Sequence, residues 1–171
     1  MRYKYLVFDL DDTLNNDDEN RRYAIKEVLR CLNKEISDEV VNDFLKFDNK
    51  YWSDRANGSI KDLVQFETVE EKVIYRRSQR FVLFFQDMTL DKAKEVNRLY
   101  LEKLKENIVA IDGALDIIKY VHEKGYKIVI ATNGPTVAIG GKLEKIGIDK
   151  YVDCIFASEE VRLYETKKRV Y

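Results

Sequence analysis

The chain has 171 residues, of which 45% are hydrophobic, and its 30 lysine and arginine residues nearly balance 31 aspartate and glutamate residues, giving a net charge of −1. A globular chain of this length buries roughly 70% of its unfolded surface. The charge balance argues against binding to a nucleic-acid polymer, and no apolar run approaches the length of a membrane span. Cys31 and Cys154 lack metal-site spacing and no signal-peptide pattern opens the chain, so we expect reduced thiols and a cytoplasmic protein.

An apolar run near the start of the chain ends in carboxylates. Leu6-Val7-Phe8 shows no alternation, which predicts a strand buried on both faces. Asp9 follows at the carboxyl end of this strand, where parallel sheets bind their ligands, and the turn brings Asp11 toward the same point. Two carboxylates this close predict a shared proton or a bound divalent metal, and Mg²⁺ fits the oxygen donors of Asp9 and Asp11. A helix-loop-helix calcium loop is excluded because Leu14 stands where the turn needs glycine.

Helical periodicity dominates the next part of the chain. Either Asp17 or Asp18 is the expected cap of the first helix, and Ser37 that of the second. The expected helices run over residues 16–32, from 38 to a break at 57–59, from 60 to 85 with an interruption left open, and from 89 or 90 to 105. Residues 16–107 are therefore expected to form a helical cap inserted into an α/β core of residues 1–15 and 108–171, with hinges near Asn15 and between Asn107 and Ile111.

Strands and helices alternate in the remainder of the chain. We expect a helix ending before Gly125, a buried strand over residues 126–131, a helix over 136–146 and a third strand over 152–157. This order predicts an α/β fold with a parallel sheet. Thr132, Asn133 and Gly134 follow the second strand, where a hydroxyl and free backbone amides at the start of a helix can bind phosphate.

The stretch Phe8 to Leu14 resembles the first motif of the haloacid dehalogenase (HAD)-like hydrolase superfamily. The resemblance implies a Rossmann-like parallel core with an inserted helical cap, and Mg²⁺ as cofactor. It further implies that Asp9 attacks phosphorus to form an aspartyl phosphate, and that Asp11 protonates the leaving oxygen and then activates water. The turn after the second strand resembles the second motif, so Thr132, Asn133 and Gly134 are carried over as phosphate-binding residues.

Within the superfamily the chain is most similar to the bacterial noncanonical pyrimidine 5′-nucleotidases. The similarity rests on residues 49–60, on residues 131–134 and on 158–161. It implies a nucleoside 5′-monophosphate as substrate, with Asn49, Lys50 and Trp52 as candidate substrate residues. Trp52 or Tyr51 could stack on a base, and packing of both rings between cap helices is the alternative.

The end of the chain departs from the family pattern. Glu165 occupies the position of the third-motif lysine, which Lys167 or Lys168 could replace by a shift of register, and a frameshifted tail is the alternative. The fourth motif, which completes the magnesium shell in the family, is missing. In the family the strand that carries it covers the first strand, so we expect Tyr3 to Phe8 to form an exposed edge and to promote a homo-oligomer or domain swap.

These features predict a magnesium-dependent phosphomonoester hydrolase that acts on a small phosphate ester, and the resemblance narrows the substrate to a nucleoside 5′-monophosphate. One alternative is a catalytically impaired relative that binds phosphate or a protein partner. A second alternative is a phosphosugar mutase, because the first motif does not separate transfer to water from transfer to a sugar. Turnover of a generic phosphomonoester separates the first alternative from the hydrolase.

Overall fold

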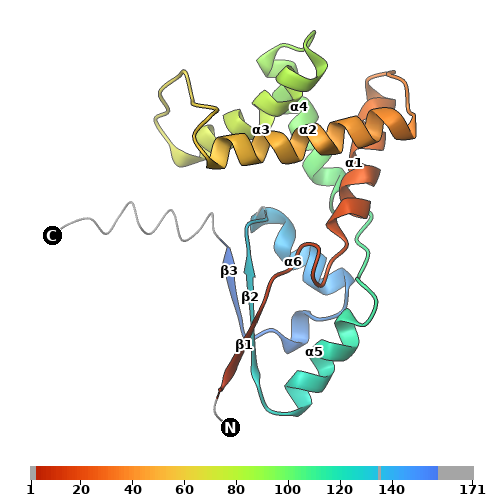
Figure 1. The fold of residues 1–171 in the computed structure, drawn as a ribbon, viewed down its shortest axis with the longest axis vertical. Coiled ribbons are helices and arrows are strands. Elements are labelled where there is room, and N and C mark those ends of the chain that lie inside the picture. The colour runs from red at the N-terminus through yellow and green to blue at the C-terminus, as the bar shows by residue number, and fades with distance from the viewer. Residues whose placement is uncertain (1–2, 135, 158–171) are drawn as a thin grey trace, which may run out of the picture. The chain divides into compact units, whose positions relative to one another are not determined.

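The computed structural model describes residues 3–134 and 136–157, except for the side chains of residues 136–138. The chain divides into two compact units (Figure 1). The first unit takes in the residues up to Asn20 and those from Leu104 onward, and it contains the sheet. The second unit, Arg21–Lys103, contains only helices among its described elements. The structure thus has an α/β part and a helical part.

The α/β unit is built on a parallel three-stranded sheet in the order β1-β2-β3, as expected from the alternation of strands and helices. The strands are β1 (Tyr5–Phe8), β2 (Lys127–Thr132) and β3 (Cys154–Ala157). The helices are α5 (Ala114–Glu123) and α6 (Thr136–Lys145), and a short 3-10 helix, η1, covers Asp149–Tyr151. Phe8 pairs with Ile130, so the first two strands end side by side.

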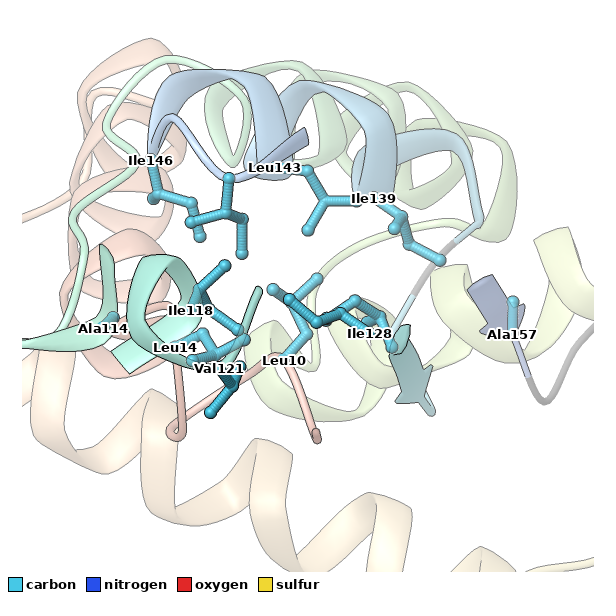
Figure 2. Close-up of a cluster of buried hydrophobic side chains, with 12 residues drawn as sticks. Leu10, Leu14, Ala114, Ile118, Val121, Ile128, Ile139, Leu143, Ile146 and Ala157 are labelled. Atoms are coloured by element: carbon cyan, nitrogen blue, oxygen red, sulfur yellow. The ribbon is translucent and has the colours of Figure 1, made fainter. Parts of the chain in front are cut away.

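One continuous hydrophobic core joins α5 and α6 to the sheet. Figure 2 shows the side chains of Ile139 and Leu143 on α6, and of Ile146 directly after that helix, pointing toward those of α5 and β2. The buried cluster consists of Leu10, Leu14, Ala114, Ile118, Val121, Ile128, Ile130, Ile139, Leu143, Ile146, Ile148 and Ala157. Leu10 and Leu14 belong to the loop after β1, so burial of these two side chains fixes that loop against the core.

The prediction that β1 is buried on both faces is wrong. Leu6 and Phe8 are half-buried against the core, whereas Tyr5 and Val7 are 63% and 65% exposed. The strand lies at the edge of the three-stranded sheet, and within the described residues little covers the face that Val7 shares. The expected exposed apolar edge is therefore present, and self-association through it stays a prediction.

The helical unit contains most of α1 (Asp17–Cys31), together with α2 (Asp38–Ala56), α3 (Val69–Phe85) and α4 (Leu90–Lys103). The prediction that the third helix starts at residue 60 is wrong. It starts at Val69 because Thr68 accepts a hydrogen bond from the backbone of Glu71, whose side chain accepts one from the backbone of Thr68. This reciprocal cap fixes the helix start, and the segment before it forms a loop.

The prediction that Asp17 or Asp18 caps α1 is also wrong. Asp17 is the first helical residue, and the capping oxygens come from the residues before it. The Asn16 side chain accepts from the backbone N–H of Glu19 at 3.2 Å, and the Asp12 carboxylate accepts from that of Asp17 at 3.2 Å. The loop after β1 therefore also starts α1. Ser37 caps α2 as expected, accepting from the backbone of Val40.

A buried ionic network lies within the helical unit. The carboxylate of Asp48, 3% exposed, accepts hydrogen bonds from Arg21 at 2.9 Å, from Arg80 at 3.0 Å and from the indole N–H of Trp52 at 3.1 Å. The guanidinium of Arg80 lies 4.7 Å from the ring centroid of Tyr100. These contacts join α1, α2, α3 and α4 around one anion. Among the described helices, none is both long and apolar enough to cross a membrane.

Candidate active site

The loop after β1 carries the acidic residues of the first motif. Asp9 directly follows the strand and is exposed, and extending the register by one residue places it opposite Ala131. The next residue, Leu10, is fully buried, and its carbonyl accepts from the backbone N–H groups of Leu14 and Asn15, both at 2.9 Å. These hydrogen bonds close a tight loop, which holds the acidic residues at the end of the sheet.

The two carboxylate oxygens of Asp11 have different surroundings. Oδ1 accepts from the side-chain amide of Asn15 at 2.9 Å and from Nζ of Lys142 at 2.5 Å. Oδ2 faces the turn after β2, because a Cβ atom built on Gly134 would lie 2.8 Å from it and 3.2 Å from Oγ1 of Thr132. The loop after β1 and the turn after β2 therefore meet at Asp11 and Gly134.

The turn after β2 presents a hydroxyl beside this carboxylate. Thr132 is 6% exposed, and its Oγ1 accepts from the backbone N–H of Gly134 at 2.9 Å. The Thr132 hydroxyl retains its own hydrogen for donation. Asn133 is exposed, and α6 begins two residues after Gly134. The Gly134 amide is engaged inside the turn, so among residues 132–134 the Thr132 hydroxyl and the Asn133 amide can donate to an anion.

Gly134 lies so close to Asp11 and Thr132 that a side chain at this position would collide with them. In Gly134→Ala the new methyl group would displace Oδ2 of Asp11 or Oγ1 of Thr132, so we expect turnover of a phosphomonoester to fall on the order of 10²-fold. Steady-state kinetics with thermal unfolding measures this effect. Gly140→Ala is the matched control, because a Cβ there meets no atom within 4 Å and alanine favours the helix. Equal turnover in Gly134→Ala and the original protein would contradict the predicted crowding.

Lys142 is a site residue that sequence reasoning missed. It lies on α6, is 2% exposed, and its Nζ donates to Oδ1 of Asp11 at 2.5 Å and to Oδ1 of Asp17 at 2.8 Å. Burial by itself lowers the pKa of Lys142, but the carboxylates of Asp17 and Asp11 outweigh burial and raise that pKa above its ordinary value. The helical spacing could have indicated a buried lysine, because Lys142 follows Ile139 by three residues and precedes Ile146 by four, and both isoleucines face the core.

The segments that were expected to act as hinges are hydrogen-bonded to each other within the α/β unit. The backbone N–H of Asn16 donates to the carbonyl of Val109 at 2.8 Å, and that of Ile111 donates to the carbonyl of Leu14 at 3.0 Å. Asn15 is fully buried beside them, and its amide nitrogen holds Oδ1 of Asp11. Both connections to the helical unit are therefore linked to the loop that carries the carboxylates.

Of the two carboxylates expected to bind Mg²⁺, Asp9 suits the ion better than Asp11. Among the described residues, no group of three or more histidine, cysteine, aspartate or glutamate side chains could hold a metal ion. Mg²⁺ retains several waters and often takes only one or two protein carboxylates, so the exposed carboxylate of Asp9 fits it. Oδ1 of Asp11 is less suitable, because the ammonium of Lys142 lies 2.5 Å away and repels a second cation.

The candidate substrate residues lie on α2. Trp52 is 36% exposed, and its indole is held by Asp48, whereas Lys50 forms an ion pair with Asp54 at 2.7 Å. Asn49 is exposed. Tyr51 is 2% exposed and donates to the carbonyl of Arg76, so this ring packs between helices, as the alternative to base stacking expected. Of the two rings, only Trp52 is accessible. The predictions for residues 158–161 and for Glu165, Lys167 and Lys168 concern positions outside the described residues.

Comparison with known proteins decides the family. The model of the haloacid dehalogenase-like hydrolases matches residues 3–171. The chain belongs to this family. Pyrimidine 5′-nucleotidase PynA of Streptococcus pneumoniae is 27% identical over 163 residues, which are 95% of this chain and 64% of PynA. Pyrimidine 5′-nucleotidase YjjG of Escherichia coli is 22% identical over 171 residues, all of this chain and 69% of YjjG.

Solved structures of the family share the fold. The HAD-hydrolase YfnB from Bacillus subtilis, crystallised with magnesium, aligns with 100% of this chain and 75% of its own at a TM-score of 0.76 and 20% identity. A predicted phosphoglycolate phosphatase from Haemophilus somnus aligns with 92% of this chain and 63% of its own at a TM-score of 0.60 and 18% identity. At these identities the likeness concerns the fold, which is the α/β family fold expected from the sequence.

Proposed function

We propose that the protein is a magnesium-dependent phosphomonoester hydrolase that acts on a nucleoside 5′-monophosphate. The observation that carries the proposal is the meeting of Asp11 with Thr132 and Gly134 directly beside the strand that positions Asp9. A nucleophile, a proton carrier and anion-binding donors at the same edge of the sheet would meet the requirement for phosphoryl transfer. Membership of the hydrolase family supports the same chemistry.

In the first step the carboxylate of Asp9 attacks phosphorus. A bond forms between an Asp9 oxygen and phosphorus while the bond from phosphorus to the ester oxygen breaks. Asp11, with a proton on Oδ2 while Oδ1 accepts from Lys142, gives that proton to the leaving oxygen, so the alcohol departs neutral. The Thr132 hydroxyl and the Asn133 amide donate to the phosphoryl oxygens and keep the phosphorus in line with Asp9.

In the second step water hydrolyses the aspartyl phosphate. Asp11, now ionised, takes a proton from water, whose oxygen bonds to phosphorus as the bond to Asp9 breaks. Inorganic phosphate leaves, Asp9 is again an ionised carboxylate, and Asp11 again carries a proton. Bound Mg²⁺, held by Asp9, would neutralise charge on the transferring phosphoryl group.

The substrate class rests on the relatives and on one accessible ring. PynA and YjjG are both named as pyrimidine 5′-nucleotidases, and the chain spans 64% and 69% of their lengths. Trp52 offers an exposed indole whose N–H donates to Asp48, and such a ring can stack on a base. We assign Asn49 and Lys50 to the same substrate-binding role, because they precede Trp52 on α2 with exposed side chains.

Phosphate release from a panel of esters tests the proposal. The full chain is incubated with magnesium and with pyrimidine and purine nucleoside 5′-monophosphates, ribose 5-phosphate and p-nitrophenyl phosphate. We expect phosphate release that stops on chelation of magnesium and is fastest with a nucleotide. No release from any ester, with inorganic phosphate still bound, would overturn the hydrolase and select the non-catalytic relative. Equal rates with all esters would overturn only the nucleotide assignment.

A further inference from the structure

Lys142 connects α6 to two acidic residues near the start of the chain, more than 100 residues away in the sequence. Its ammonium, on α6, bridges Asp11 in the loop after β1 and Asp17 at the start of α1, and the lysine is 2% exposed. The lysine to carboxylate distances are 2.5 Å and 2.8 Å. All three residues belong to the α/β unit. A buried ammonium thus bridges two partly buried acidic side chains beside the proposed site of phosphoryl transfer.

Packing does not explain why this position holds a charged residue. The neighbours of Lys142 on the same helical stripe, Ile139, Leu143 and Ile146, are all buried and apolar. Removing an ammonium from water is unfavourable, whereas an apolar side chain would fill the same place without that desolvation cost. The ammonium is therefore best explained by the two carboxylates that it holds.

The bridge restricts the carboxylate of Asp11. A carboxylate rotates readily about its last side-chain bond, because the barrier is low and the two orientations are nearly equivalent. Lys142 and the amide of Asn15 both donate to Oδ1, so rotation would break two hydrogen bonds, one of them charge-assisted. With Oδ1 held, Oδ2 is directed at Gly134 and Thr132.

We propose that Lys142 is a positioning residue that fixes Asp11, with Oδ1 bound and Oδ2 directed to the turn that binds phosphate. Asp17 anchors the other side of the ammonium and holds it in place. This inference rests on the proposed function, in which Oδ2 of Asp11 carries the proton to and from the reacting oxygens. Loss of the ammonium would let the carboxylate turn away, which affects the chemical step more than the binding of substrate.

The test compares Lys142→Met with Lys142→Arg. Methionine fills the apolar stripe without charge, and arginine restores a cation that reaches both carboxylates. We expect kcat of Lys142→Met to fall on the order of 10- to 100-fold, the range typical of residues that orient a catalytic group, with KM near its original value. Lys142→Arg should recover most of kcat. Thermal unfolding of both variants shows whether the fold is retained.

The side-chain amide of Asn15 gives a second readout that needs no turnover. In the original protein and in Lys142→Arg, its NMR signals should show slow exchange with solvent, because the amide is buried and donates to Asp11. In Lys142→Met these signals should shift and exchange faster. If the original protein has no turnover but the signals change in this way, the proposed function fails and the positioning role stands. The positioning role would be overturned if Lys142→Met left both kcat and the Asn15 signals unchanged. It would also be overturned if Lys142→Met and Lys142→Arg lost kcat and stability equally.

Discussion

Replacing Asp9 by asparagine is expected to abolish phosphomonoester turnover, with a loss on the order of 10⁴- to 10⁶-fold, the range seen when an enzyme loses its nucleophile. The neutral amide has nearly the same shape as the carboxylate but forms no acyl phosphate. Because Asp9 is exposed at the end of β1, the substitution should leave the fold intact. Initial rates of phosphate release with magnesium, measured at saturating ester, give the size of the effect.

Asp12→Asn is the matched control for this experiment. Asp12 lies in the same loop, is exposed, and loses the same charge on substitution. Its φ of 60° lies in the left-handed region, which asparagine tolerates as well as aspartate. We expect Asp12→Asn to keep nearly full turnover. Turnover of Asp9→Asn equal to that of Asp12→Asn would refute the role of Asp9 as nucleophile.

Replacing Asp48 by alanine is expected to lower the free energy of unfolding of the helical unit by about 3–5 kcal/mol, the usual cost of removing one partner of a buried ion pair. The variant would leave the guanidinium of Arg80, a residue only 5% exposed, without its anion, and would remove the acceptor of Arg21 and of the Trp52 indole. Repacking does not offset this loss, because Arg80 is enclosed by the rings of Phe81 and Tyr100.

Denaturant unfolding, monitored by tryptophan fluorescence, measures the stability of the helical unit separately. Trp52 is the only tryptophan of the 171-residue chain and lies in the helical unit, so its emission reports on that unit. Far-UV circular dichroism follows both units together. Asp43→Ala, at an exposed position of the same helix, is the control and should change stability by less than about 0.5 kcal/mol. An Asp48→Ala transition that coincides with that of Asp43→Ala would mean that the network contributes little.

The sequence was most informative where local chemistry decides the structure. The run Leu6-Val7-Phe8 and the apolar stretch before Thr132 predicted adjacent parallel strands, and both are present. Ser37 predicted the start of α2 because a side-chain cap is a local interaction. The first motif likewise predicted the family, because the spacing of Asp9 and Asp11 is a property of one short loop.

Features that depend on tertiary contacts were predicted wrongly or were missed. The exposure of Val7 depends on what covers the sheet, which three apolar residues in a row do not reveal. The late start of α3 at Val69 depends on the reciprocal cap of Thr68 and Glu71, which interrupts a stretch with helical periodicity. Lys142 was missed because its partner Asp11 is 131 residues away in the sequence.

The proposed reaction depends on a covalent bond between Asp9 and phosphorus. The most direct measurement is mass spectrometry of protein that has been mixed with magnesium and a turning-over phosphomonoester and then quenched in acid, which preserves an acyl phosphate. We predict one phosphoryl group on the peptide that contains Asp9, absent after hydroxylamine treatment and absent from Asp9→Asn. Phosphate release without any such adduct, or an adduct that persists in Asp9→Asn, would contradict the claim.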